Sequence, residues 1–282
     1  MSTENTKQVL QATWDAAATG WAKWEGELSR HLSAPTEMLL DQAGVSVGMR
    51  VLDLACGAGA QTLAAAKRVG VGGRVVACDI AAEMLRHLGE NAKRAGLANI
   101  ETLHCAAEDL ADGGETFDGA ISRLGLMLFP SPQNALGAVQ GVLRPGARFA
   151  ALVFTTPANN PFMAQPMGIM LRHAGKQPPA PGQPGIFALG AEGVLEGILT
   201  GRGFADVRSK VVRAPLRLAS ADDALVMMQE AFGAYRAVIA ELSEGARAAA
   251  WADVETCLGQ FESESGFEAQ FEFIIGSGAA PG

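Results

Sequence analysis

An apolar strand that leads directly into a glycine-rich turn constrains this chain more than any other feature. The strand and turn read VLDLACGAGA from Val51 to Ala60, and a helical pattern follows over residues 60–70. Gly57 and Gly59 allow the backbone to adopt conformations that other residues avoid and to approach a ligand closely. In a parallel sheet, ligands bind beyond the carboxyl ends of the strands, so the sequence predicts a ligand site at this turn.

Strand and helix patterns alternate beyond the turn. Strand patterns at 73–80, 99–105, 117–122 and 147–154 are separated by helical patterns at 81–96 and 131–143. Such alternation is typical of a parallel sheet with helices on both faces. Because 282 residues are many for one domain and few for two large ones, the sequence predicts one α/β core. We expect a Rossmann-like, doubly wound core with a mostly parallel seven-stranded sheet.

Helical periodicity precedes this core. Within residues 1–45, Trp14, Trp21 and Trp24 fall on one helical stripe. Packing into the core accounts for such a stripe, and so does a helix that folds over a bound ligand. We expect residues 1–45 to form an N-terminal helical lid.

The core, residues 46–282, is interrupted twice. Residues 155–188 carry seven prolines, too many for a continuing sheet. Residues 216–265 read largely as two further helices ahead of a last strand over 267–276. We expect both stretches to be insertions that form a cap over the site.

Charge narrows the classes of partner. The chain has 22 basic and 30 acidic residues, a net charge of −8, and no dense cluster of lysine and arginine. Nucleic-acid binding depends on such clusters to release counterions from phosphates, so we expect a small-molecule partner and no nucleic acid. No apolar run reaches the ~18 residues that a membrane span requires. The first residues show neither a signal nor a transit pattern, so the cytoplasm is the expected location.

The four cysteines carry no metal signature. Cys56, Cys78, Cys105 and Cys257 are separated by 22, 27 and 152 positions. This spacing fits neither a zinc site nor a small disulfide framework. We therefore expect no metal site and interpret these cysteines as small buried side chains.

Three classes of ligand compete for the glycine turn. A triphosphate loop requires Lys-Ser or Lys-Thr directly after its last glycine, and no such pair follows Gly57 or Gly59. A dinucleotide loop requires a third small residue where this chain has Thr62, and the carboxylate of Asp53 would repel a pyrophosphate. Asp53 instead suits a ligand that carries a positive charge beside a carboxylate, as an amino acid does.

The second strand ends with another carboxylate, Asp79, twenty positions beyond Gly59. A carboxylate at this place can accept hydrogen bonds from both hydroxyls of a ribose. A ligand that combines a ribose, an ammonium and a carboxylate without a phosphate is S-adenosylmethionine.

Several motifs in order resemble the class I S-adenosylmethionine-dependent methyltransferases. The segment from Asp53 to Gly59 is similar to the family's first motif, and Asp79-Ile80 with Met84 is similar to its ribose and adenine segment. The stretch LRPGARF is similar to the family's loop before its fifth strand. The stretches FDGAISRLGLMLFPSP, NNPFM and GIFALG resemble the ubiquinone/menaquinone-biosynthesis-like branch, which acts on small molecules. The likeness covers roughly residues 10–215.

The resemblance implies a set of cofactor-binding residues, beginning with Asp53. In the family, the backbone of the glycine turn cradles the methionine part, the second-strand acid binds the ribose, and neighbouring side chains contact the adenine. The family usually has Asp-Ala where this chain has Ala106-Ala107, so an adenine contact would come from the Ala107 N–H or from Glu108. The remaining residues with implied roles are Ala55, Gly57, Gly59, Asp79, Ile80 and Met84.

For the reaction, the family chemistry implies in-line displacement of the sulfonium methyl group by a nucleophile of the acceptor. A general base is needed only if the acceptor must lose a proton. His173, in the proline-rich insertion, is the candidate base. Trp21, Arg123 and Tyr235 are candidate acceptor contacts. Because both insertions are rich in apolar side chains, the expected acceptor is a small apolar or aromatic metabolite.

Two other functions remain open from the sequence. One is an NAD(P)-dependent oxidoreductase, which Asp53 and Thr62 disfavour. The other is a non-catalytic protein that binds S-adenosylmethionine. The sequence carries no signal for the oligomeric state.

Overall fold

A single twisted sheet forms the centre of the molecule, which a computed structural model describes for residues 3–110, 116–180, 182–264 and 266–282. Seven strands follow the order β3-β2-β1-β4-β5-β8-β6, and the two-residue β7 pairs with β8. The strands are β1 (Arg50–Leu54), β2 (Arg74–Asp79), β3 (Ile100–His104), β4 (Phe117–Arg123), β5 (Leu143–Phe154), β6 (Ala205–Leu218), β7 (Glu262–Ser263) and β8 (Gly266–Ala279). This arrangement confirms the predicted mostly parallel α/β core, although with β7 the sheet of the described residues has eight strands where seven were expected.

The pairing of β1 determines where a ligand can bind. β1 runs parallel to β2 on one side and to β4 on the other, while β8 is antiparallel to both β5 and β6. The chain moves outward from β1 to β3 and then returns to β4, so the strand order reverses beside β1. A crevice at the carboxyl ends of the strands is expected at such a reversal.

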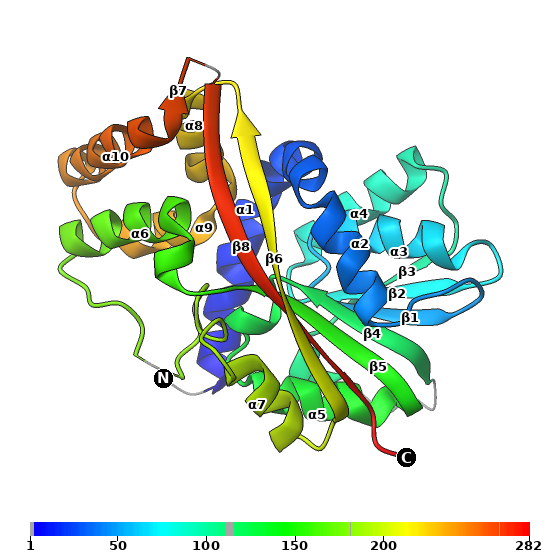
Figure 1. Ribbon diagram of the computed structural model, residues 1–282. Helices are drawn as coiled ribbons and strands as arrows, with labels where there is room; N and C mark the ends of the chain where they lie inside the picture. Colours follow the sequence, from blue (N-terminus) through cyan, green and yellow to red (C-terminus); the bar gives the residue numbers. More distant parts are fainter. Residues whose placement is uncertain (1–2, 111–115, 181, 265) are drawn as a thin grey trace.

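Helices cover the sheet, and a group of them lies together beside one end of β8 (Figure 1). The central strands are almost wholly buried because helices pack on both of their faces, which explains their continuous apolar sequences. None of the helices in the described ranges is long and apolar enough to cross a membrane. The helices are α1 (Thr3–His31), α2 (Ser33–Gln42), α3 (Ala60–Val69), α4 (Ala82–Arg94), α5 (Pro132–Val142), α6 (Pro161–His173), α7 (Val194–Gly201), α8 (Ala221–Ala231), α9 (Gly233–Ile239) and α10 (Glu244–Leu258).

The long N-terminal helix α1 lies between the core and the helices α6, α8, α9 and α10 (Figure 1). Gly20 permits the close contact of α1 with α8, because a Cβ atom at this position would lie 2.0 Å from the backbone oxygen of Glu230. At the same contact, Lys23 Nζ lies 2.7 Å from the Glu230 carboxylate, and Trp24 Nε1 donates to it over 2.6 Å. Helix α1 therefore connects the core to α8.

Residues 216–265 form three helices where the sequence pattern indicated two. The chain turns at Phe232 between α8 and α9, and a Cβ atom on the following Gly233 would lie only 3.1 Å from Ala17 Cβ of α1. The close approach of α1 thus coincides with the break, which the helical periodicity of the segment does not reveal.

The NNPFM segment anchors α6 to the sheet. Asn160 is fully buried and its amide oxygen accepts a hydrogen bond from the backbone N–H of Glu272 in β8, over 2.9 Å. Its amide nitrogen donates to the Glu272 carbonyl and to Thr155 Oγ1, over 3.0 and 3.1 Å. This side chain thereby takes the place of a strand neighbour for β8.

We predict that Asn160→Ala lowers the free energy of unfolding by about 1–3 kcal/mol, because the buried N–H of Glu272 loses its acceptor. Urea denaturation measures this change. The control is Asn134→Ala on the exposed surface of α5, for which we expect almost no effect. Equal stability of the two variants would contradict the anchoring role.

Candidate active site

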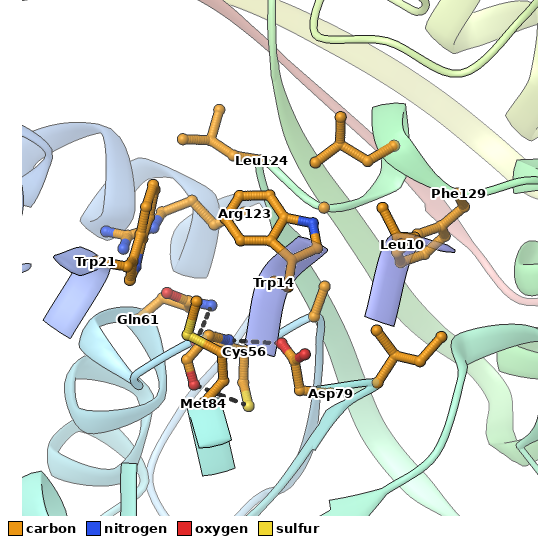
Figure 2. A pocket seen from close by; sticks show the side chains of 15 residues that line it. Leu10, Trp14, Trp21, Cys56, Gln61, Asp79, Met84, Arg123, Leu124 and Phe129 are labelled. Carbon is orange, nitrogen blue, oxygen red and sulfur yellow. Dashed lines mark hydrogen bonds between the residues drawn. The ribbon is translucent and has the colours of Figure 1, made fainter. Parts of the chain in front are cut away.

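A crevice lies at the predicted edge, beyond the carboxyl ends of β1, β2 and β4. It has two adjoining parts, which we call the main chamber and the side chamber. The main chamber encloses about 640 Å³, a volume that includes open space at its mouth. It is lined by Leu10, Trp14, Trp21, Ala55, Cys56, Gly57, Gln61, Asp79, Ile80, Met84, Arg123, Leu124, Gly125, Leu128 and Phe129 (Figure 2).

The side chamber extends the crevice toward the end of β3. It shares Leu10, Ala55, Asp79, Ile80 and Phe129 with the main chamber. Its other lining residues are Lys7, Cys78, Cys105, Ala106, Ala107, Glu108 and Pro130. Ile80, Met84, Ala107 and Glu108, four of the predicted cofactor contacts, therefore line one chamber or the other.

The turn after β1 presents its backbone to the main chamber. Ala55 and Gly57 both lie in the left-handed region, with φ of 53° and 56°. For alanine this conformation is unfavourable by roughly 1–2 kcal/mol. Gly125 makes room for the side chain, because a Cβ atom there would lie 2.5 Å from Ala55 Cβ.

Asp79 braces this turn from the end of β2. One carboxylate oxygen accepts the Gly57 N–H and the other accepts the Ala81 N–H, each over 2.9 Å. Burial raises the pKa of the Asp79 carboxyl, although these backbone hydrogen bonds oppose the change. Asp79 also lines both chambers, so its carboxylate is accessible at their junction.

Asp53 does not face the crevice, which corrects the prediction of a direct ligand contact. It has no exposed surface. Its carboxylate accepts a 2.6 Å hydrogen bond from Thr62 Oγ1 and a 3.4 Å one from Gln61 Nε2. Burial is the main reason that the pKa of Asp53 rises to about 7. Asp53 therefore supports the turn from inside the protein. Of its two hydrogen-bond partners, Gln61 lines the main chamber.

The amino end of α3 is already occupied, which corrects a second expectation. The resemblance implied that Gly59, at the start of this helix, would help to cradle the methionine part of the cofactor. The Ala60 N–H instead donates to Glu25 Oε1 of α1 over 3.0 Å, and Asn91 Nδ2 donates to Glu25 Oε2 over 2.8 Å. Gly59 lines neither chamber. It packs against Leu88, because a Cβ atom at Gly59 would lie only 2.1 Å from Leu88 Cδ1.

Aromatic side chains of α1 form one wall of the main chamber. Trp14 and Trp21 pack edge to face, with ring centres 5.7 Å apart. Trp21 was predicted as an acceptor contact, whereas Trp14 was noted only as part of the helical stripe. Leu128 and Phe129, in the segment that follows β4, line the chamber as well and were not predicted.

His173 and Tyr235 lie outside the crevice and line neither chamber, so both predicted roles are corrected. His173 pairs with Asp253 of α10, Nε2 to Oδ2 over 2.7 Å. Tyr235 is buried, and its hydroxyl donates to the Met163 carbonyl over 2.8 Å. Helix α1 separates α6 and α9, which carry these two residues, from the crevice. Phe232, between α8 and α9, accordingly packs against Trp21 of α1 and does not line the crevice.

We predict that stability falls as Asp53 ionises. Burial raises its pKa from 3.8 to about 7 in the folded state, so its contribution to stability is fully present below about pH 4 and is lost as the pH rises to about 7. The corresponding loss is at most ~4 kcal/mol. Urea denaturation at several pH values measures the free energy of unfolding. As the pH rises, this free energy should fall less steeply in Asp53→Asn than in the unsubstituted protein, and the fall that remains comes from other buried carboxyls. Asp222→Asn, on the exposed surface of α8, is the control. Identical slopes for Asp53→Asn and the unsubstituted protein would contradict this assignment.

Comparison with known proteins finds a family match for the part of the chain that contains β1, β2 and β4. Residues 51–146 match the methyltransferase domain family. The chain is 36% identical over 123 residues to the ubiquinone/menaquinone biosynthesis C-methyltransferase UbiE of Cronobacter sakazakii, a match that covers 43% of this chain and 49% of the relative. The chain thus spans about half the length of the curated relatives that it matches.

Solved structures share the fold over a greater length. The [4+2]-cyclase SpnF superposes with a TM-score of 0.63 at 15% identity, covering 98% of this chain and 97% of that one. Phosphoethanolamine N-methyltransferase 2 of Haemonchus contortus, solved with S-adenosyl-L-methionine, gives a TM-score of 0.54 at 16% identity and covers 88% of this chain and 53% of that one.

The structural matches agree with the overall fold described above. Residues 51–146 carry a methyltransferase domain, and part of the chain is similar to the ubiquinone/menaquinone biosynthesis C-methyltransferases.

Proposed function

We propose that this protein transfers a methyl group from S-adenosylmethionine to a small apolar or aromatic acceptor. The observation that carries the proposal is the junction of the two chambers, where the Asp79 carboxylate lies beside the left-handed turn of Ala55 and Gly57. A carboxylate beside an exposed backbone suits a nucleoside that has no phosphate.

The residues present fit the cofactor in one direction along the crevice. The side chamber offers the apolar surroundings of Ile80 and Ala107 to an adenine. Asp79 would hold the ribose, since its buried carboxylate can accept further hydrogen bonds from hydroxyls. The methionine part would then extend over the turn into the main chamber, toward Gln61 and Trp21.

The occupied end of α3 argues against a dinucleotide. Pyrophosphates bind the free N–H groups at the start of the helix that follows the first strand. Here the Glu25 carboxylate accepts the Ala60 N–H, and a second negative group at this place would be repelled. An NAD(P)-dependent oxidoreductase is therefore disfavoured. A non-catalytic binding protein is distinguished from an enzyme by turnover.

The residues of the main chamber orient reactants and exclude water. S-adenosylmethionine, when bound, supplies a sulfonium methyl group that is ready for displacement. Trp14, Trp21, Leu124 and Leu128 would hold an apolar acceptor in line with it and keep water out.

The described lining of this chamber includes no histidine. Its one thiol, Cys56, has a pKa raised by burial and stays neutral. An acceptor that needs no dedicated base, or loses its proton readily, suits these surroundings.

Turnover is the direct test of the proposal. The protein is incubated with S-adenosylmethionine and a panel of aromatic and apolar acceptors, and S-adenosylhomocysteine and methylated product are measured by mass spectrometry. We expect product with at least one acceptor of this class. Tight binding of S-adenosylhomocysteine without turnover across the panel would favour the non-catalytic function, and absence of binding would refute the cofactor.

We predict that Asp79→Asn weakens S-adenosylhomocysteine binding by about 1.5–3 kcal/mol, because a neutral amide replaces a charged acceptor of the ribose hydroxyls. Isothermal titration calorimetry measures the change, and Asp222→Asn serves as the control. A thermal melt checks that the turn held by Asp79 remains folded. Unchanged affinity in a folded variant would refute the ribose assignment.

A further inference from the structure

Arg123, the last residue of β4, is the one basic residue among those described as lining the main chamber. Its side chain is more than nine-tenths buried, with 8% of its surface exposed. Of its five N–H donors, the hydrogen bond found in the described structure is from Nη1 to Thr36 Oγ1, over 3.0 Å. Most of a buried guanidinium therefore remains without a hydrogen-bond acceptor.

The guanidinium faces the chamber at the end opposite the side chamber. Figure 2 shows it beside the indole of Trp21 and above Gln61, whereas Leu10 and Phe129 lie at the other end. The carboxylate of Asp79 lies between these two ends (Figure 2). A ligand that extends from the side chamber along the crevice would bring its far end to Arg123.

The neighbouring carboxylates do not satisfy the guanidinium. Glu25 and Asp53 are close enough to raise the pKa of Arg123, although burial lowers it more. Glu25 accepts its hydrogen bonds from Ala60 and Asn91, and Asp53 accepts its hydrogen bonds from Thr62 and Gln61. A planar guanidinium with free N–H donors matches the two oxygens of a carboxylate.

We infer that Arg123 forms a carboxylate-binding subsite at the Trp21 end of the main chamber. The inference rests on the proposed function for the direction in which the cofactor lies. In that direction the cofactor's own α-carboxylate reaches Arg123, and a carboxylate on the methyl acceptor is the other source of the same chemistry. Either way, Arg123 is a binding residue that selects for a ligand with a negatively charged end.

The first experiment compares two ligands that differ in the amino-acid part. S-adenosylhomocysteine carries the carboxylate, and 5′-methylthioadenosine lacks the whole amino-acid end while keeping the adenosine. Both are titrated by calorimetry into the unsubstituted protein, Arg123→Met and Arg123→Lys. If the cofactor supplies the carboxylate, Arg123→Met weakens S-adenosylhomocysteine binding about 10- to 100-fold and leaves 5′-methylthioadenosine binding unchanged. Arg123→Lys, which keeps the charge, retains part of the affinity.

The second experiment examines the acceptor. Benzoate and its neutral analogue benzamide are titrated into the protein saturated with S-adenosylhomocysteine. If the acceptor supplies the carboxylate, Arg123→Met leaves S-adenosylhomocysteine binding intact and removes a preference for benzoate over benzamide. Arg172→Met, on the exposed surface of α6, is the matched control for loss of an arginine.

The outcomes separate this inference from the proposed function. Unchanged 5′-methylthioadenosine binding shows that the variant's adenosine site is folded. If Arg123→Met changes neither the affinity for S-adenosylhomocysteine nor the preference for benzoate over benzamide, while 5′-methylthioadenosine still binds, the carboxylate subsite is refuted and the cofactor assignment stands. If the unsubstituted protein binds neither adenosine compound, the proposed function itself fails. If Arg123→Met does not fold, the Arg123→Lys comparison decides, because loss of the planar fork should still reduce S-adenosylhomocysteine or benzoate binding several-fold.

Discussion

The hydrogen bond from the Gly57 N–H to Asp79 is the contact on which the crevice depends. It connects the turn after β1 to the carboxyl end of β2, and the same carboxylate holds the start of the next segment through Ala81. Because the turn is fixed in a left-handed conformation, its backbone groups face the chamber. One aspartate thus shapes the turn and lines both chambers, which explains why the crevice forms at this strand reversal.

Helix α1 completes the crevice from the outside. Its Glu25 occupies the amino end of α3, its tryptophans form a chamber wall, and its Gly20 lies against helix α8. Since these contacts lie along one helix, movement of α1 would open the chamber and disturb the α3 end together. We propose on this basis that residues 1–45 act as a lid whose position is coupled to the helices of the 216–265 insertion.

The sequence predicted the sheet and the position of the crevice well, because strand-helix alternation and the glycine turn are local patterns. Asp79, Ile80 and Ala107 line the crevice because they follow the ends of strands, where parallel topology gathers them. Glu25 was missed because it is one charged residue on a long helix, and only tertiary packing brings it to α3. His173 and Tyr235 were misplaced since chain order does not reveal that α1 lies between their helices and the chamber. Asp53 was misjudged because the burial of its carboxylate depends on Thr62 and Gln61 folding over it.

The central claim is that the Asp79 junction binds a nucleoside that has no phosphate. A crystal structure of the protein with S-adenosylhomocysteine tests it most directly. The account predicts adenine in the side chamber, both ribose hydroxyls on Asp79 and the amino-acid part over Ala55 and Gly57. An adenine found at the Trp21 end of the main chamber, or a ribose without contact to Asp79, would contradict it.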